Sequence, residues 1–453
     1  MRRHRALGTF YFTTLARGLA ELRQLEKALQ LYGQALTFYG ELARERPEVY
    51  RPYVAVVLNN LAYLQRDLND LEAARASFGK ALEIRRELAR ERPEVYRPDV
   101  AMALNNLGNV QSASNDLEDA RASFQEALGI YRELARPQPE VYRRELAVTL
   151  NNLGNVQCEL NALEAGRASF SEALAMCREL AQQRPEVHRP DVAMALNSLG
   201  TVQHDLRELE SARASFEEAL AIRRELARER PEVYRPYVAM TLNTLGAVQC
   251  DLNALEAARA SIEQGLTICR ELARQRPEVY RPYVAMTLNT LGAVQCDLNA
   301  LEAARASFEE ANDLYDADAA KNRFAHLVER MRCRDNLGRL LLRESSAPGK
   351  PDYALARGKF RQARAIFEQF RARFVNPGER KRVLREAVGI YERLLQTCVD
   401  LWDVSLADNK PDYRALREAV EVAEASRSRH LIDLLAHEAL DPRFAPAHLA
   451  EDF

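Results

Sequence analysis

The 453-residue chain is 47% apolar and 29% charged, so it can bury a large core and is not disordered by composition. Its 64 basic and 66 acidic side chains leave a net charge of −2, which argues against nucleic-acid binding, because that function requires a basic excess or a basic face. No stretch of about 18 apolar residues occurs, so the sequence predicts no helix that spans a membrane. The seven cysteines include no Cys-x-x-Cys pair, a pattern typical of reduced thiols in a cytoplasmic protein.

A repeat with a period of 46 residues organises most of the sequence. The string PEVYRP or a near copy recurs, with its first proline at Pro47, Pro93, Pro139, Pro185, Pro231 and Pro277. Residues 231–261 and 277–307 are identical, which indicates a recent duplication. Internal repetition at a fixed period of this length is typical of solenoid proteins.

Each repeat contains two helical patterns. Over residues 100–110, apolar residues recur every three or four positions, as they do on one face of a helix. We expect Pro98 to be the first residue of this helix, where proline is tolerated, and the PEVYRP string to be a loop. Asn115 and Asp116 offer an N-cap to a second helix. This second helix is expected to span about 22 residues, or roughly 33 Å, before Pro137 stops it.

Small residues recur at fixed points of both helices. In the second helix they flank an aromatic residue, as Ala120 and Ala127 flank Phe124. In the first helix a small residue follows a leucine, and these residues are Ala16, Ala62, Gly108, Gly154, Gly200, Gly246 and Gly292. We expect the two helices to approach closely at the small residues, with the aromatic ring filling the gap beside them.

This pattern resembles the tetratricopeptide repeat, which places Leu-Gly on its first helix and Ala…Phe…Ala on its second. The unit is longer than the usual 34 residues and, with its LNNL string, is similar to the long repeats of kinesin light chains. The resemblance implies an all-α, right-handed α-α superhelical solenoid of about nine helix pairs. Seven 46-residue repeats are expected over 5–318, a degenerate eighth helix pair over 319–374, a long C-terminal helical hairpin over 378–440 and a tail over 441–453.

One face of the first helices is the predicted binding groove. Counting Gly108 as position 8, positions 2, 5, 9 and 12 share this face, which by resemblance lines the groove. Amides can pair with both N–H and C=O groups of an extended peptide, and methionines give adaptable apolar contact. The predicted peptide-binding residues are Asn59, Asn105, Asn109, Asn151, Asn155, Asn197, Asn243, Asn289, Met102, Met194, Met240 and Met286. The alternative is that the asparagines hydrogen-bond between neighbouring repeats and serve only the stacking.

Two other uses of the groove are not supported by the sequence. Positions 5 and 9 of the middle repeats hold no Lys or Arg, so the groove does not resemble the carboxylate clamp that captures an acidic C-terminal peptide. Position 12 holds Cys158, His204, Cys250 and Cys296. Zinc ligands must lie about 2.0–2.3 Å from one ion, whereas equivalent residues of stacked helices lie about 8–10 Å apart. We therefore expect no metal, and no other cofactor is indicated.

Catalytic motifs are not found in the sequence. It contains no Gly-rich phosphate loop, no H-E-x-x-H and no G-x-S-x-G. The seven histidines are scattered along the chain. A hydrolase that uses an unrecognised Cys/His pair stays open as an alternative.

The segment 417–436 carries a second resemblance. It is similar to the helix that joins tetratricopeptide arrays to the caspase-like CHAT peptidase domain of bacterial proteins. The matching residues are Ala423, Glu424, Arg427, Ser428, Arg429, Leu431, Asp433, Leu434 and Leu435. Those proteins use a Cys–His dyad in the following domain. Here only residues 436–453 follow, so the implied protease chemistry is assigned to no residue of this chain.

The sequence therefore predicts a non-enzymatic cytoplasmic scaffold that binds a protein or an extended peptide. In the sharper form, the chain is the sensor or regulatory part of a bacterial TPR-CHAT-type signalling or defence system, with the protease domain absent from it. A CHAT-type protease or its activator is then an expected partner, whereas a membrane and nucleic acid are not. The alternatives are a stand-alone adaptor and, as a separate structural class, a self-assembling scaffold.

Overall fold

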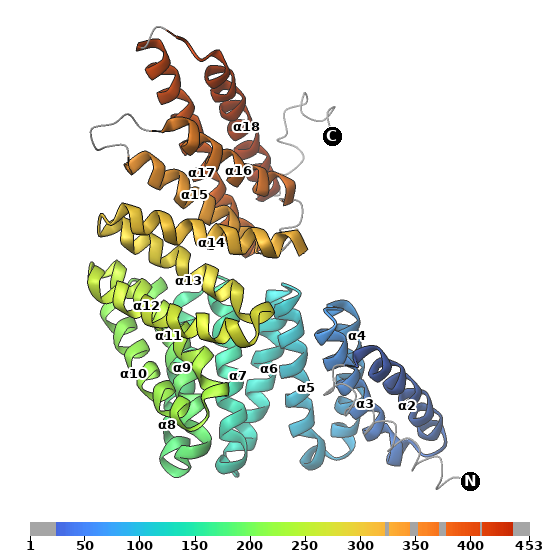
Figure 1. The fold of residues 1–453 in the computed structure, drawn as a ribbon. Coiled ribbons are helices and arrows are strands. Elements are labelled where there is room, and N and C mark those ends of the chain that lie inside the picture. The colour runs from blue at the N-terminus through green and yellow to red at the C-terminus, as the bar shows by residue number, and fades with distance from the viewer. Residues whose placement is uncertain (1–23, 322–325, 345–351, 371–376, 408–409, 438–453) are drawn as a thin grey trace, which may run out of the picture. The chain divides into compact units, whose positions relative to one another are not determined.

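The computed structural model describes residues 24–321, 326–344, 352–370, 377–407 and 410–437. All regular secondary structure in these ranges is helical, which confirms the predicted all-α solenoid class (Figure 1). The chain divides into two compact units, residues 1–234 and 235–453, which are described separately. None of the described helices is long and apolar enough to cross a membrane.

The described residues of the first unit form one helix and four helix pairs, in which each helix packs against the next along the chain. The helices are α2 (Leu25–Glu45), α3 (Pro47–Asp67), α4 (Leu71–Glu91), α5 (Pro93–Ala113), α6 (Leu117–Ala135), α7 (Pro139–Glu159), α8 (Leu163–Gln183), α9 (Pro185–Asp205) and α10 (Leu209–Glu229). The expected first helix of the 5–46 repeat, with Ala16, lies outside the described residues.

The second unit continues the pairing. Its helices are α11 (Pro231–Asp251), whose first four residues precede the unit boundary, α12 (Leu255–Gln275), α13 (Pro277–Asp297), α14 (Leu301–Lys321), α15 (Leu327–Glu344), α16 (Tyr353–Phe370), α17 (Pro377–Ala407) and α18 (Tyr413–His437). The described side chains of α18 end at Ala425, so most of the residues that resemble the CHAT junction lie beyond them. The predicted tail at 441–453 also lies outside the described part.

The PEVYRP string is helical, so the prediction of a loop was wrong. Only Arg92 separates α4 from α5, and α5 begins at Pro93 rather than at Pro98. Pro93 already takes the first helical position, where its missing N–H costs no hydrogen bond. Pro98 lies inside the helix, where it leaves only the carbonyl of Glu94 without an i to i−4 donor. The extra residues of the 46-residue unit therefore lengthen the helices and not the loops.

The predicted cap at Asn115 is also corrected. Asn115 has a φ of 65° and ends α5, because a left-handed residue is the usual end of a helix and asparagine tolerates it. Asp116 is the N-cap residue of α6, but its side chain makes no capping hydrogen bond. It pairs instead with Arg75 of the preceding repeat.

The close contact between small and aromatic residues is confirmed. A Cβ atom added to Gly154 would lie 2.7 Å from Cε1 of Phe170, and one added to Gly292 would lie 2.7 Å from Cε1 of Phe308. Both rings are fully buried. At these two repeats the ring therefore lies in the space that a side chain at the glycine would fill, and the two helices are in close contact there.

A serine–glutamine hydrogen bond joins the two helices of each repeat at a second point. The serine hydroxyl of the second helix donates to the glutamine Oε1 of the first, at 2.7–2.8 Å. The pairs are Ser77–Gln65, Ser123–Gln111, Ser169–Gln157, Ser215–Gln203, Ser261–Gln249 and Ser307–Gln295. The serines are buried and the glutamines are buried or half-buried, and each pair satisfies these polar groups inside its own repeat.

Candidate binding surface on the first helices

The first helices present a repeated surface, which we call the first-helix face. It comprises positions 2, 5, 6, 9, 12 and 13 of α3, α5, α7 and α9 in the first unit, and of α11, α13 and α15 in the second. Position 2 is exposed at Met102, Met194 and Met240, each at about 40% of its full area, and Met286 is half-buried. Exposed apolar side chains at a fixed repeat position give this face a row of adaptable contacts.

The asparagines of position 5 are largely engaged between repeats. Asn106 Nδ2 donates to Asn59 Oδ1 at 3.1 Å, and Asn152 Nδ2 donates to Asn105 Oδ1 at 3.3 Å. The same bond joins Asn336 to Asn289 at 3.2 Å. In these three pairs an asparagine at position 6 donates to position 5 of the preceding repeat, and we call this series the amide ladder. At these positions the asparagines hydrogen-bond between neighbouring repeats, as the stacking alternative supposed.

The amide ladder is interrupted where position 6 is Ser or Thr. Ser198 occupies the place from which an asparagine would donate to Asn151, and Thr290 occupies the equivalent place for Asn243. The Oδ1 atoms of both asparagines are buried without a hydrogen-bond partner. Asn197 avoids this, because Nη1 of the buried Arg223 donates to its Oδ1 at 2.9 Å. A buried carbonyl oxygen without a hydrogen bond lowers the stability of the fold. Each interruption therefore leaves one unsatisfied acceptor, on Asn151 or on Asn243.

The predicted peptide-binding residues differ in how accessible they are. Asn155 is exposed, whereas Asn59 and Asn151 are buried. The half-buried ones are Asn105, Asn109, Asn197, Asn243 and Asn289. Peptide binding by these residues stays a prediction, and Asn155 with the methionines of position 2 are the members most open to a partner.

Restoring the amide ladder should stabilise the first unit. We expect Ser198→Asn to raise the free energy of unfolding by about 1 kcal/mol, because the longer amide can donate to Asn151 Oδ1. Asn152→Ser removes the donor to Asn105 and should lower it by a similar amount. Urea unfolding followed by circular dichroism measures both, and two unchanged midpoints would refute the importance of the ladder.

Of two pockets on this face, the larger lies in the first unit, beside Ser198. It has a volume of about 450 Å³ and is lined by residues of α5, α7, α8 and α9. Asn155, Cys158 and Glu159 form the α7 side, and Phe170 forms part of the wall. The α9 side is polar, with Ser198, Thr201 and Asp205. The short side chain of position 6, Ser198, thus forms part of the polar wall of this pocket.

Two carboxylates, those of Glu159 and Asp205, line this pocket. Within the described residues, neither Glu159 nor Asp205 forms a hydrogen bond or an ion pair, and partial burial raises the pKa of both carboxyls. His204 and Arg207 oppose this rise at Asp205. Both carboxylates also raise the pKa of the neighbouring Cys158. Desolvation without an ion-pair partner disfavours the charged form of a carboxyl group. The charged forms of Glu159 and Asp205 are therefore destabilised by their partial burial.

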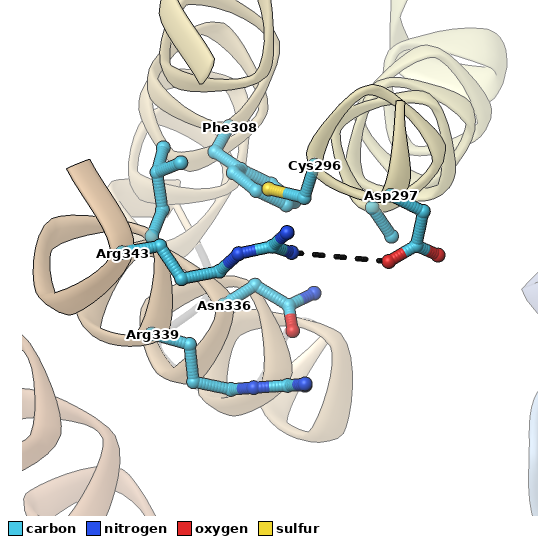
Figure 2. A pocket seen from close by; sticks show the side chains of 8 residues that line it. Cys296, Asp297, Phe308, Asn336, Arg339 and Arg343 are labelled. Atoms are coloured by element: carbon cyan, nitrogen blue, oxygen red, sulfur yellow. Dashed lines mark ion pairs between the residues drawn. The ribbon is translucent and has the colours of Figure 1, made fainter. Parts of the chain in front are cut away.

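The smaller pocket lies in the second unit and is drawn in Figure 2. It has a volume of about 180 Å³ and lies between α13, α14 and α15. Nη1 of Arg343 lies 3.9 Å from Oδ1 of Asp297, and its guanidinium points across the pocket toward that carboxylate beside Cys296 (Figure 2). Arg339 lies on the same side as Arg343. Here the chain itself supplies the cation for the pocket acid.

Position 13 was not among the predicted site residues, although the sequence carries the signal. The position is acidic at Glu159, Asp205, Asp251 and Asp297 and becomes arginine at Arg343. Position 13 lies one residue beyond the predicted groove positions 2, 5, 9 and 12. The helical periodicity alone therefore did not place it at a pocket. The column of charges would have identified it.

The thiols of position 12 are kept protonated. Burial, with Asp205 and Glu159 nearby, raises the pKa of Cys158 to about 11, and burial also raises the pKa of Cys250 and Cys296. A nucleophilic cysteine needs a lowered pKa. These sites thus lack the setting that the hydrolase alternative requires. Among the side chains that the structure describes, no group of three or more His, Cys, Asp or Glu could hold a metal ion.

Three family models of the tetratricopeptide repeat match the chain, over residues 55–88, 100–135 and 145–225. No curated protein matches it in sequence.

Solved structures are similar to this chain at low sequence identity. A signal transduction ATPase with numerous domains from Pyrococcus horikoshii, which has a tetratricopeptide repeat sensor, is 13% identical with a TM-score of 0.52; the match covers 90% of this chain and 54% of that one. The quorum sensor NprR from B. thuringiensis is 14% identical, with a TM-score of 0.48 and coverage of 89% and 98%. BtubC from P. vanneervenii is 21% identical, with a TM-score of 0.45 and coverage of 56% and 93%. The matched family models and the paired helices show that this chain contains tetratricopeptide repeats stacked as an α-α solenoid.

Proposed function

We propose that the chain is a non-enzymatic scaffold that binds a partner protein through an extended segment laid on the first-helix face. The observation that carries the proposal is the exposure of methionines at position 2 of this face in both units, together with a polar-lined pocket on the same face of the first unit. Soluble proteins rarely leave apolar side chains in a row without a contact to make. Apolar anchors combined with a few polar groups are typical of surfaces that bind peptide segments.

In the finer form of the proposal, the scaffold is the sensor or regulatory part of a CHAT-type protease system. Its support is the sequence likeness of residues 417–436. The start of α18 is anchored to the preceding helices, since Glu418 pairs with Arg361 of α16 and Val422 is fully buried. A partner that shifts the packing of these helices would therefore move α18, and with it any domain or partner attached there.

A substitution on the first-helix face tests the coarser proposal. Random dodecapeptides displayed on phage are selected against the full chain, and the affinity of the best peptide is measured by fluorescence anisotropy. Met194→Glu is expected to weaken binding by at least about tenfold, because it removes an apolar contact worth about 1.5–3 kcal/mol. Ala175→Glu on α8 adds the same charge at an exposed position of a second helix and should leave the affinity unchanged. Equal affinities for wild type and Met194→Glu would contradict the proposal.

A further inference from the structure

The two pockets of the first-helix face occupy the same place in two different repeats. Each is lined by positions 9, 12 and 13 of one first helix, by the aromatic residue of the paired second helix, and by positions 6, 9, 10 and 13 of the next first helix. Cys158 and Phe170 in the larger pocket thus correspond to Cys296 and Phe308 in the smaller. Because the lining positions are equivalent, a change of side chain at one of them changes the charge or the volume of the pocket and so the ligand that fits it.

The smaller pocket shows how this architecture binds a guanidinium. Arg343 comes from position 13 of the following helix, and its guanidinium faces Asp297 at position 13 of the preceding one (Figure 2). It is close enough to Cys296 to lower the pKa of that thiol, against the effect of burial. The arginine thus supplies a counter-charge to Asp297 from inside the pocket.

In the larger pocket the cation is missing and an acid stands in its place. The residue equivalent to Arg343 is Asp205, which faces the pocket together with Glu159. The pocket is also larger, at about 450 Å³ against about 180 Å³. Its lining also includes Ser198, at the interruption of the amide ladder. The two carboxylates are acceptors, so they fit a ligand with several N–H donors and a positive charge.

We infer that the larger pocket is a subsite for a basic side chain of the bound protein, with arginine preferred. The inference rests on the proposed peptide-binding function and adds its chemistry. A guanidinium entering from the partner would take the place that Arg343 takes in the smaller pocket. It would pair with Glu159 and Asp205, and the planar group, with five N–H donors, is suited to reach two carboxylates at once.

A displayed-peptide selection with matched variants tests the inference. Wild-type chain should select dodecapeptides with Arg or Lys at one fixed position. Asp205→Arg copies Arg343, fills the pocket, and should lose that preference. Glu83→Arg makes the same charge change at an exposed acid of α4 and should keep it. Should Asp205→Arg fail to fold by circular dichroism, the isosteric double variant Glu159→Gln/Asp205→Asn replaces it with the same expectation.

A charge-neutral copy of the best peptide makes the test quantitative. Replacing its conserved arginine with citrulline keeps the shape and removes the charge. This change should weaken binding to wild type about tenfold, since two partly exposed ion pairs are lost, and should hardly affect binding to Asp205→Arg. Selected peptides that lack a fixed basic residue, or a citrulline peptide of undiminished affinity, would overturn the subsite while leaving peptide binding intact. Failure to select any peptide would count against the proposed function as well.

Discussion

Phe170→Ala is expected to lower the free energy of unfolding by about 3–5 kcal/mol. The ring is only 2% exposed and lies against Gly154, where the two helices of its repeat approach most closely. Truncation removes its buried apolar area and leaves a cavity that the rigid helix pair cannot close. Because each repeat of a solenoid is stabilised mainly by its neighbours, a cavity in one repeat weakens the stacking on both sides.

A double-mutant cycle with Gly154 distinguishes this contact from a general loss of core. Gly154→Ala alone should be destabilising by about 1–3 kcal/mol, because its methyl group overlaps the ring. Ala62 faces Phe78 in the equivalent place, so the lower end of that range is expected. Combined with Phe170→Ala, the same methyl group fills part of the cavity, and the two changes should cost about 1 kcal/mol less than their sum. Additive effects would contradict a direct contact between the two side chains.

Circular dichroism and tryptophan fluorescence distinguish the unfolding of the two units in this measurement. Circular dichroism follows all helices, whereas Trp402, the sole tryptophan of the chain, lies on α17 of the second unit beside Tyr413. Phe170→Ala should therefore shift the urea midpoint of the dichroism signal more than that of the tryptophan fluorescence. Different midpoints are expected for a repeat protein, which is not bound to unfold in one step.

The helix pairing could be predicted because it depends on local spacing. Gly154 and Phe170 stand at fixed positions of one repeat, and the same spacing recurs at Gly108 and Phe124. The start of α5 could not be placed in this way. Pro93 and Pro98 both suit a first helical position, and only the packing of the longer helix decides between them.

The candidate site depends on contacts between repeats, which spacing does not report. The asparagines of position 5 were open to two interpretations, and the choice depends on the residue 47 positions later. An asparagine there, as at Asn152, completes the amide ladder, whereas Ser198 interrupts it and borders a pocket. Whether an acid of position 13 is paired likewise depends on the following repeat. Asp297 is paired with Arg343 of that repeat, whereas Glu159 has Asp205 at the equivalent place.

Asp335→Ala should destabilise the second unit by about 2–3 kcal/mol. This is slightly less than is usual when a buried ion pair is broken, because the partner, Arg393, is one-third exposed. Asp335 replaces the asparagine of position 5 in α15, and only 6% of it is exposed. Its two carboxylate oxygens accept from Nε and Nη2 of Arg393 on α17, at 2.7 and 2.8 Å. The position that elsewhere links consecutive first helices by an amide here anchors the C-terminal hairpin by a bidentate ion pair. Removing the carboxylate leaves a partly buried guanidinium without its counter-charge.

The control for this prediction removes both charges. Asp335→Ala/Arg393→Met takes away the unpaired cation and should recover much of the lost stability, because replacing a buried pair with apolar side chains is often neutral. Since α17 carries Trp402, thermal unfolding followed by its fluorescence reports the anchored hairpin directly. Asp335→Ala should shift the fluorescence midpoint at least as far as the dichroism midpoint, the reverse of the order expected for Phe170→Ala. A fluorescence midpoint equal to that of wild type would show that α17 and α18 are held by their apolar contacts alone, with residues such as Leu394 sufficient to keep them docked.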